Sequence, residues 1–470
     1  MAPIIVWVRR DFRLHDNPLL KAAADTGRPV IPVFLYDGVA EAMGACPRWR
    51  LGIGAEAFDA RLKEIGSRLI FRRGSALAAL RSLLAETGAT AVWWGRLYDP
   101  AAVARDTKVK AALGAAGIEA RSIAGHVLHE PWTVETGSGG FYRVYTPFWK
   151  AVQGREVAEP LVAVTRLVAP DAWPASDDPR SWGLEKAMDR GAAVVRRHIA
   201  VGESAAQDRL SAFVADRIGD YDHGRDIPGQ AATSRLSENL THGEISIRTA
   251  WHAGRRALEE GRTGAETFLK ELIWRDFATH LVYHTPHITT GNWRPEWDAF
   301  PWNDDPASPE VTAWTRGRTG IAFVDAAMRE LYTTGYMHNR ARMIVASYLT
   351  KHLLSNWKIG LDWFADTLVD WDPASNAMGW QWSAGSGPDA TPYFRVFNPV
   401  TQLEKFDKDR SYVHRWIAEG MSDPDPDALS YFDAIPRHWG LSPGDTYPEP
   451  IVTAAVGRAR ALEAYENREF

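Results

Sequence analysis

The stretch IIVWVRRDFRLHDNPLLKAAADTGRPVIPVFLY, residues 4–36, decides the fold of this chain. It opens with a run of apolar, mostly β-branched residues at 4–8 and closes with a second apolar run at 30–36. Between the two runs, residues 17–26 follow the spacing of an amphipathic helix. A strand, a helix and a strand in this order predict two parallel strands joined by a crossover helix.

The same alternation continues outward from this stretch. We expect a parallel, Rossmann-like sheet of five strands, with helices on both of its faces. The expected strands lie at 4–8, 30–36, 69–71, 90–94 and 118–123, and the expected helices lie at 17–26, 48–67, 75–87 and 100–116. Residues 1–125 thus form an α/β domain. A proline- and glycine-rich connector is predicted for 126–200, and a larger all-α domain for 201–470.

Composition excludes several classes of protein. The chain has 470 residues and a single cysteine, which rules out a disulfide framework, a thiolate zinc site and a four-cysteine iron–sulfur cluster. It contains no apolar run of 18 residues, and arginines directly follow the first apolar run, so we expect neither a membrane helix nor a secretion signal and place the protein in the cytoplasm. Residues 1–125 have a net charge of +6 and the remainder −11, which taken alone argues against binding nucleic acid.

Two local patterns imitate known sites. Residues 52–57 spell a GxGxxA motif, but no strand precedes it, so we do not expect a dinucleotide site there. His280, His284 and His287 have the spacing of metal ligands, yet no supporting carboxylate accompanies them, and we predict no metal site.

A cluster of hydroxyl groups marks the first candidate site. Tyr221 and Arg225 precede TSRLS at 233–237, where hydroxyls gather at an expected helix start around Arg235. Free backbone N–H groups and a guanidinium there suit an anion such as a diphosphate. In isolation, an ordinary N-cap explains the hydroxyls better.

Polar and aromatic residues share one face of the helix expected at 268–281. Glu271, Trp274 and Arg275 are spaced so that they point the same way. A face that carries a carboxylate, an indole and a guanidinium is too polar for a core and too aromatic for a plain surface. We interpret it as the wall of a wet pocket.

Two later segments have similar character. In GYMHNRARMIVASYL (335–349), Asn339, Arg342 and Met343 share a helix face and Arg340 turns away from it. The segment DWDPASNAMGWQW (370–382) places two carboxylates and an amide before two tryptophans that are two residues apart. On a helix such residues point in nearly opposite directions, so we expect the two tryptophans to line different cavities, one inward and one outward.

The blocks TSRLS, ELIWRDF (271–277), MHNRARM (337–343) and NAMGWQW (376–382) are long and specific. Together with VWVRRDFRLHDNPLL (6–20) and RVYTPFWK (143–150), they resemble the DNA photolyase/cryptochrome family over essentially the whole chain. This resemblance implies an α/β domain, a connector and a helical domain that encloses flavin adenine dinucleotide (FAD).

The resemblance also implies which residues bind FAD. The hydroxyl-rich segment would hold the ribityl and diphosphate portions, Asp370 and Asp372 the polar edge of the ring, with Arg342 paired to Asp370. Asn376 falls where the family has the residue facing flavin N5; plant-type cryptochromes carry Asp there, so the neutral amide favours repair. The implied FAD-binding residues are Tyr221, Arg225, Thr233, Ser234, Arg235, Leu236, Ser237, Arg342, Asp370, Trp371, Asp372 and Asn376.

The implied substrate is a flipped-out pyrimidine pair in DNA. Glu271 and Asn339 would bind the base edges. Relatives that repair (6-4) photoproducts have histidines in place of Asn339 and Met343, so the resemblance favours cyclobutane pyrimidine dimers. The implied DNA-binding residues are Glu271, Trp274, Arg275, Asn339, Arg340, Met343 and Trp382, and phosphates would be bound without sequence preference by a monomer.

The implied reaction is light-driven electron transfer from excited reduced FAD to the dimer. A relay would re-reduce oxidised flavin through Trp380, then Trp357, then Trp302 at the surface. One alternative is a cryptochrome-like blue-light receptor, which would need a C-terminal extension where residues 452–470 form a charged helix. Another is a dark flavin oxidoreductase, which lacks a nicotinamide site here.

A second, antenna chromophore is expected from the resemblance. The folate contacts of the enterobacterial type fall on Met43, Ala101 and Ala102, which cannot replace a histidine, an asparagine or a glutamate. A different folate geometry or a deazaflavin remains open.

Overall fold

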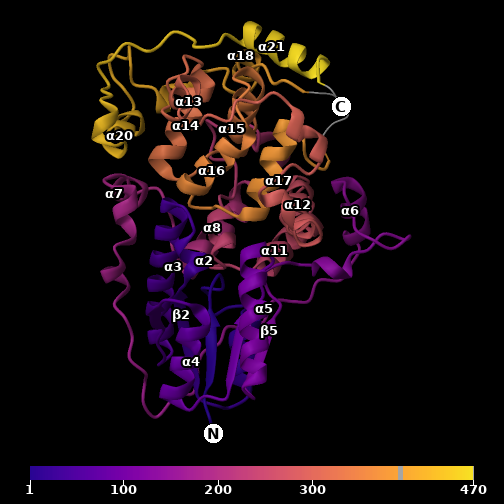
Figure 1. Cartoon of the computed structure of the whole chain (residues 1–470), viewed down its shortest axis with the longest axis vertical. Helices are drawn as coiled ribbons and strands as arrows, with labels where there is room; N and C mark the ends of the chain where they lie inside the picture. Colours follow the sequence, from indigo (N-terminus) through magenta and orange to yellow (C-terminus); the bar gives the residue numbers. More distant parts are fainter. Residues whose placement is uncertain (390–394, 469) are drawn as a thin grey trace. The chain divides into compact units, whose positions relative to one another are not determined.

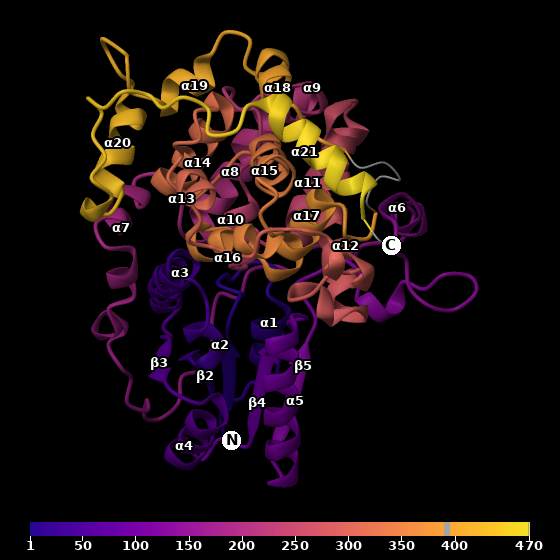
Figure 2. The same cartoon turned by 45° about the horizontal axis from the view of Figure 1, so that its top comes forward.

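The computed structural model describes residues 1–389, 395–468 and 470. These residues divide into two compact units, and Figures 1 and 2 label many of their helices and strands. Unit 1 comprises Met1–Leu184, Ala200–Tyr221 and Ser234–Pro286, and unit 2 comprises Glu185–Ile199, Asp222–Thr233 and His287–Phe470.

Within the described residues, unit 1 contains one parallel sheet of five strands in the order β3-β2-β1-β4-β5. Their bounds are β1 (Ile4–Val8), β2 (Val30–Tyr36), β3 (Ile70–Arg73), β4 (Ala91–Gly95) and β5 (Glu119–Ile123). All five predicted strands and the parallel pairing are thus confirmed. The register pairs Ile4 with Val30 on one side and with Ala91 on the other. The chain therefore leaves β1 toward one side of the sheet and later returns beside it at β4.

Alternating side chains of the strands form two cores. Ile5 and Trp7 pack with Leu80 and Leu113 of the helices α4 (Ala76–Thr87) and α5 (Pro100–Ala115). On the opposite face, the Phe34 ring lies 6.0 Å from Phe12, which in turn lies 6.0 Å from Phe58 of α3 (Ala45–Glu64). The sheet is therefore covered by helices on both faces, as the sequence predicts.

Unit 1 also contains helices that belong to the predicted all-α region from residue 201 onward, namely those within Ala200–Tyr221 and Ser234–Pro286. Its remaining elements are α1 (Pro18–Asp25), α2 (Gly38–Glu41), η1 (Pro131–Thr133), α6 (Tyr145–Val152), η2 (Pro179–Trp182), α8 (Glu203–Asp216), η4 (Ile218–Asp220), α10 (Ser237–Thr241), α11 (Ile247–Glu259) and α12 (Gly264–His284). Asn17 caps α1, since its side chain accepts a hydrogen bond from the N–H of Leu20 at 3.0 Å.

All the named secondary-structure elements in the described part of unit 2 are helices, which confirms an α/β domain followed by helices. Its elements are α7 (Gly191–Val195), η6 (Pro295–Ala299), α13 (Pro309–Thr315), α14 (Ala322–Thr334), α15 (Asn339–Ser347), the π-helix η7 (Tyr348–His352), α16 (Trp357–Thr367), α17 (Pro373–Ala384), α18 (Pro399–Phe406), α19 (Ser411–Trp416), α20 (Pro426–Ala434), η8 (Arg437–Trp439) and α21 (Ala454–Glu466). Three short elements lie at the unit boundaries: η3 (Leu184–Met188), α9 (Tyr221–Gly224) and η5 (Pro286–Thr289).

The connector predicted for 126–200 is loop-rich but contains the helices α6 and α7. The compact units are defined by packing, and the domain boundaries at 125 and 200 stay a prediction. None of the helices in the described ranges is long and apolar enough to cross a membrane.

Candidate functional site

The predicted site residues fall into two groups, one in each compact unit. Unit 1 carries Tyr221, Ser234, Arg235, Leu236, Ser237, Glu271, Trp274 and Arg275. Unit 2 carries Arg225, Thr233, Trp302, Asn339, Arg340, Arg342, Met343, Trp357, Asp370, Trp371, Asp372, Asn376, Trp380 and Trp382.

A strained backbone lies at the centre of the turn before α10. Arg235 has a φ of 52°, in the left-handed region, which costs a residue with a side chain about 1–2 kcal/mol. The helix begins at Ser237, and the capping position, Leu236, makes no side-chain capping bond. Of the hydroxyls, Ser234 Oγ accepts the N–H of Leu236 at 3.4 Å, one residue before the helix begins. Leu236 is buried, whereas the side chains of Arg235 and Ser237 are exposed.

Tyr221 lies in an aromatic contact at the end of η4. Its ring meets Phe213 edge-on at 5.3 Å and Phe268 at 6.1 Å, and it is 8% exposed. These contacts anchor the tyrosine on α8 and α12. The Tyr221 ring is therefore held in place within unit 1 by its packing against Phe213 and Phe268.

Other side chains cover part of the predicted wet face of α12. Trp274 stacks on Tyr145 with ring centroids 3.6 Å apart and planes at 6°, so one face of the indole is covered. Arg275 donates to the carbonyl of His126 at 2.6 Å and to its ring at 2.8 Å. Glu271 is half-buried on the same helix. The Arg275 guanidinium thus bonds to the connector, and its place on a pocket wall stays a prediction.

Asp276, within the ELIWRDF block, is a buried carboxyl group that the sequence interpretation did not single out. Its Oδ2 accepts the N–H groups of Leu128 and His129 at 2.9 Å each. Burial nevertheless dominates and raises the pKa of Asp276 to about 7. Asp276 therefore fastens the connector to α12 and remains able to titrate near neutrality.

This titration predicts a pH-dependent stability. Because the folded pKa is about 7 and the unfolded value is 3.8, the folded state binds the extra proton between these pH values. Stability should therefore fall as the pH rises from 4 to 7, by up to about 1.4 kcal/mol per pH unit. Asp276→Asn should make this decline smaller in urea unfolding at pH 5 and 7.5, by the part that Asp276 contributes, whereas Asp208→Asn, exposed on α8, should leave it as in the parent. An unchanged slope in Asp276→Asn would contradict the assignment.

Three side chains fix the start of α15: a neutral histidine and two arginines that each bind an aspartate. Burial lowers the pKa of His338 to about 4, so its Nδ1 is free to accept the N–H of Arg340 at 3.2 Å. Arg342 donates to both oxygens of Asp370 at 2.8 and 3.1 Å, which confirms the predicted ion pair. Arg340 points elsewhere, as predicted, and binds Asp226 at 2.5 Å.

The N-terminus of α17 presents an oriented amide. Asp372 caps the helix by accepting the N–H of Ser375 at 2.8 Å. One turn later, Asn376 Nδ2 donates to the carbonyl of Leu361 at 3.1 Å. Since a carbonyl can only accept, this bond fixes which end of the amide is nitrogen. The Oδ1 atom of Asn376 therefore remains as an acceptor.

The two tryptophans of α17 point in different directions, as predicted. Trp380 is 2% exposed and packs edge-on against Phe364 at 4.9 Å, while Trp382 is half-buried with Phe397 at 6.5 Å. Gly360 on α16 lies under the Trp380 ring, because an added Cβ would come within 2.0 Å of it. The position of Trp380 is therefore tightly defined.

The other two tryptophans of the predicted relay are buried. Trp357 is fully buried, and its Nε1 donates to Asn292 at 2.8 Å. The predicted surface position of Trp302 is wrong, since it is only 9% exposed. Trp297 and Phe300 pack on it with centroids at 5.6 and 4.7 Å, which withdraws the indole from solvent.

A cleft lies in unit 1 at the carboxyl ends of β1 and β4, where the strand order changes direction. It is lined by Arg10, Asp11, Arg13, Arg96 and His126, among others. Burial raises the pKa of Asp11, and its Oδ2 has no hydrogen-bond partner among the described residues. Such a switch point is the usual ligand position in open α/β sheets. The RRD sequence directly after the first strand was the available signal for it.

The imitating motifs have structural roles. The GxGxxA motif lies inside α3 and not between a strand and a helix start; Gly54 there allows close contact with Phe12. His280 and His284 both face the carbonyl of Pro131 at 3.2 Å.

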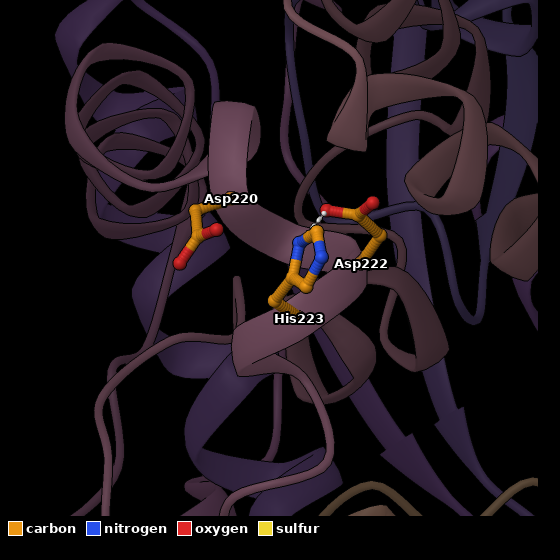
Figure 3. Close-up of side chains that lie close together, drawn as sticks. All are labelled: Asp220, Asp222 and His223. Atoms are coloured by element: carbon orange, nitrogen blue, oxygen red, sulfur yellow. Dashed lines mark hydrogen bonds and ion pairs between the residues drawn. The ribbon is translucent and has the colours of Figure 1, made fainter.

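One exposed group has the composition of a metal site. Figure 3 shows Asp220, Asp222 and His223 around the short helix α9, where His223 pairs with Asp222 at 3.0 Å. All three are exposed, and exposed acidic clusters are common without a bound ion. The cluster therefore supports no metal assignment.

Comparison with known proteins identifies the family. A model described as the FAD binding domain of DNA photolyase matches residues 268–467, and one described as DNA photolyase matches residues 4–165. A deoxyribodipyrimidine photo-lyase of Agrobacterium fabrum is 45% identical over 99% of this chain and 98% of its own length. Cryptochrome-1 of Arabidopsis thaliana is 32% identical over 98% of this chain and 70% of its own.

Solved structures support the same family. A bacterial class III photolyase from Agrobacterium tumefaciens superimposes with a TM-score of 0.91 at 44% identity, covering 99% of this chain and 97% of that one. An archaeal photolyase from Sulfolobus tokodaii, solved with two FAD molecules, gives a TM-score of 0.80 at 30% identity over 99% and 100% of the two chains. This chain therefore belongs to the DNA photolyase family.

Proposed function

We propose that this chain binds FAD and uses light to reverse cyclobutane pyrimidine dimers in DNA. The observation that carries the proposal is the orientation of Asn376. Its nitrogen is held by the Leu361 carbonyl, so a neutral oxygen is left to accept a hydrogen bond from N5–H of reduced flavin. An aspartate at this position would place a negative charge beside the reduced, anionic ring. The amide thus supports a repair enzyme.

The donor set of the chain fits FAD. Hydroxyls and the exposed guanidinium of Arg235 suit a diphosphate, and the Arg342–Asp370 pair offers a hydrogen-bonding edge for the flavin ring. Asp372 is held in place by its capping bond. The chemistry that bound FAD supplies is light-driven electron donation to the dimer and its return. The residues of the chain bind and orient FAD and the dimer, and they exclude water. Because the reaction is electron transfer, no general base is needed.

The lesion would meet residues of α12, α15 and α17. Glu271 and Asn339 are proposed to bind base edges, with Met343 beside them. Trp382 and the uncovered face of Trp274 offer apolar surfaces to the flipped bases. Phosphates are proposed to contact Arg395, Lys405 and Arg410, whose side chains are exposed in unit 2. We further propose that a monomer acts in the cytoplasm without sequence preference.

The decisive experiment is repair under blue light. The purified, FAD-loaded protein is mixed with oligonucleotides that contain a thymine dimer, and recovery of absorbance near 260 nm is followed. We expect recovery in light and none in darkness. No recovery with reduced flavin bound would overturn the proposal, and light-induced flavin reduction without repair would favour the cryptochrome-like receptor.

Asn376→Asp should shorten the lifetime of reduced flavin in air. The new carboxylate would face both the Leu361 carbonyl and the anionic ring, so reduced flavin would lose stability by about 1–3 kcal/mol. The measurement is the return of the oxidised-flavin absorbance after photoreduction. Asp362→Asn on α16 is a control outside the site. Equal lifetimes of reduced flavin in Asn376→Asp and in the parent would contradict the proposed role of the amide.

We also propose that a second chromophore binds in the cleft at β1 and β4. The unpartnered oxygen of buried Asp11 can accept an N–H from a planar heterocycle, and Arg10, which also lines the cleft, can bind its anionic groups. The Sulfolobus tokodaii photolyase has two FAD molecules. Met43 and Ala102 are buried and Ala101 carries no polar group, which disfavours the enterobacterial folate geometry.

A further inference from the structure

Arg209 reaches the strained turn before α10 from the neighbouring helix α8. Its Nη1 lies 3.2 Å from the carbonyl oxygen of Arg235, 2.8 Å from Glu238 Oε2 and 2.9 Å from Asn239 Oδ1. All four residues belong to unit 1. One side chain therefore holds the residue with the left-handed backbone and the first turn of the helix that follows it.

The partners of Arg209 are themselves fixed. Arg50, which is fully buried on α3, binds Glu238 at 2.7 Å and Glu244 at 2.7 and 2.9 Å. Asn239 donates to Glu244 at 2.6 Å. Two guanidinium groups and two carboxylates thus form a charge-balanced network, in which Arg50, Glu238 and Glu244 are buried and Arg209 is 19% exposed. Such pairing is what makes buried charges tolerable.

A left-handed residue with a side chain persists only where its surroundings determine the backbone. Here Leu236 is buried on one side of Arg235, and the carbonyl of Arg235 is held by Arg209. This leaves the side chains of Arg235 and Ser237 exposed. Without Arg209, the backbone could relax to a right-handed or extended conformation and turn these groups away.

We propose that Arg209 is a positioning residue for the diphosphate of FAD, acting through the backbone of Arg235. This inference rests on the proposed function, because it needs the turn to bind FAD. The Nη1 atom of Arg209 donates to three oxygens of the chain. Arg209 would therefore affect FAD binding through the turn and not through a contact with FAD. Arg209 itself lies on α8, outside the TSRLS segment that it supports.

The first test measures FAD affinity. Full-length protein is stripped of flavin and titrated with FAD while flavin fluorescence is followed. Arg209→Ala should weaken FAD binding by about tenfold or more, and Arg209→Lys, which keeps a charge beside Glu238, should recover part of it. The matched control, Arg256→Ala, removes an exposed arginine of α11 in the same unit and should bind FAD as the parent does. Circular dichroism establishes that each variant is folded.

The second test separates positioning from a direct contact. Asparagine tolerates the left-handed region best among residues with a side chain, so Arg235→Asn should keep the turn with less help. The loss caused by Arg209→Ala should then be several-fold smaller in the Arg235→Asn background. An equal loss in both backgrounds, or unchanged affinity in folded Arg209→Ala, would overturn the inference. A parent protein that fails to bind FAD at all would instead overturn the proposed function.

Discussion

Trp380→Phe is expected to abolish photoreduction of oxidised flavin, by about a hundredfold or more in rate, while repair by chemically reduced protein stays close to that of the parent. Trp380 is buried on the same helix as Asn376, and its indole is the oxidisable group that phenylalanine lacks. Within the described ranges its Nε1 has no hydrogen-bond partner, so the substitution leaves no acceptor unsatisfied. Trp380→Phe therefore removes an oxidisable group and leaves the hydrogen bonding of the described residues unchanged.

The two activities can be measured on one preparation. Photoreduction is followed by the loss of oxidised-flavin absorbance under blue light with a thiol donor, and repair is assayed after reduction with dithionite. Trp314→Phe is the matched control, since Trp314 packs on Trp380 at 6.1 Å and its Nε1 bonds to the carbonyl of Val345. Trp314→Phe should keep photoreduction. A folded, flavin-loaded Trp380→Phe that retains photoreduction, or that loses repair as well, would contradict this division of roles.

Much of the fold followed from periodicity. The five strands are short apolar runs separated by helical patterns, and both signals are local, so neighbouring residues suffice to predict them. The short helix α2 and the helix α6 inside the connector were missed. Such elements depend on what they pack against more than on their own residues.

The site was predictable where it depended on one helix. The opposite directions of Trp380 and Trp382, and the turning away of Arg340, follow from helical geometry and are confirmed. The Arg342–Asp370 pair came from the family resemblance. A helical face does not reveal which distant segment covers it. For this reason Tyr145 over Trp274, His126 on Arg275 and the packing of Trp297 on Trp302 could not be foreseen.

The same reasoning applies to Asp276 and Arg209. Asp276 lies inside a quoted motif, but its function depends on backbone N–H groups of Leu128 and His129, almost 150 residues earlier. Arg209 lies in no motif, and only the left-handed backbone of Arg235 makes it significant. Sequence patterns report side-chain types, whereas these roles arise from backbone groups brought together by folding.

Removing either proposed base-edge contact should lower repair of cyclobutane dimers. Glu271→Ala and Asn339→Ala each remove a hydrogen bond to a base, at a cost of about 1–3 kcal/mol, or roughly five- to 150-fold. Trp382→Ala should weaken lesion binding by about 1–3 kcal/mol through lost stacking. Glu266→Ala is the control on α12, because Glu266 is exposed and pairs with Lys270 at 2.8 Å.

Binding to undamaged DNA discriminates these contacts from general affinity. It rests on phosphate contacts, so it should hardly change in the three variants, and the preference for dimer-containing DNA should fall instead. The parent should not repair (6-4) photoproducts, since Asn339 and Met343 occupy the positions where such relatives have histidines. Efficient (6-4) repair, or an unchanged dimer preference in both variants, would contradict the assignment of the pocket.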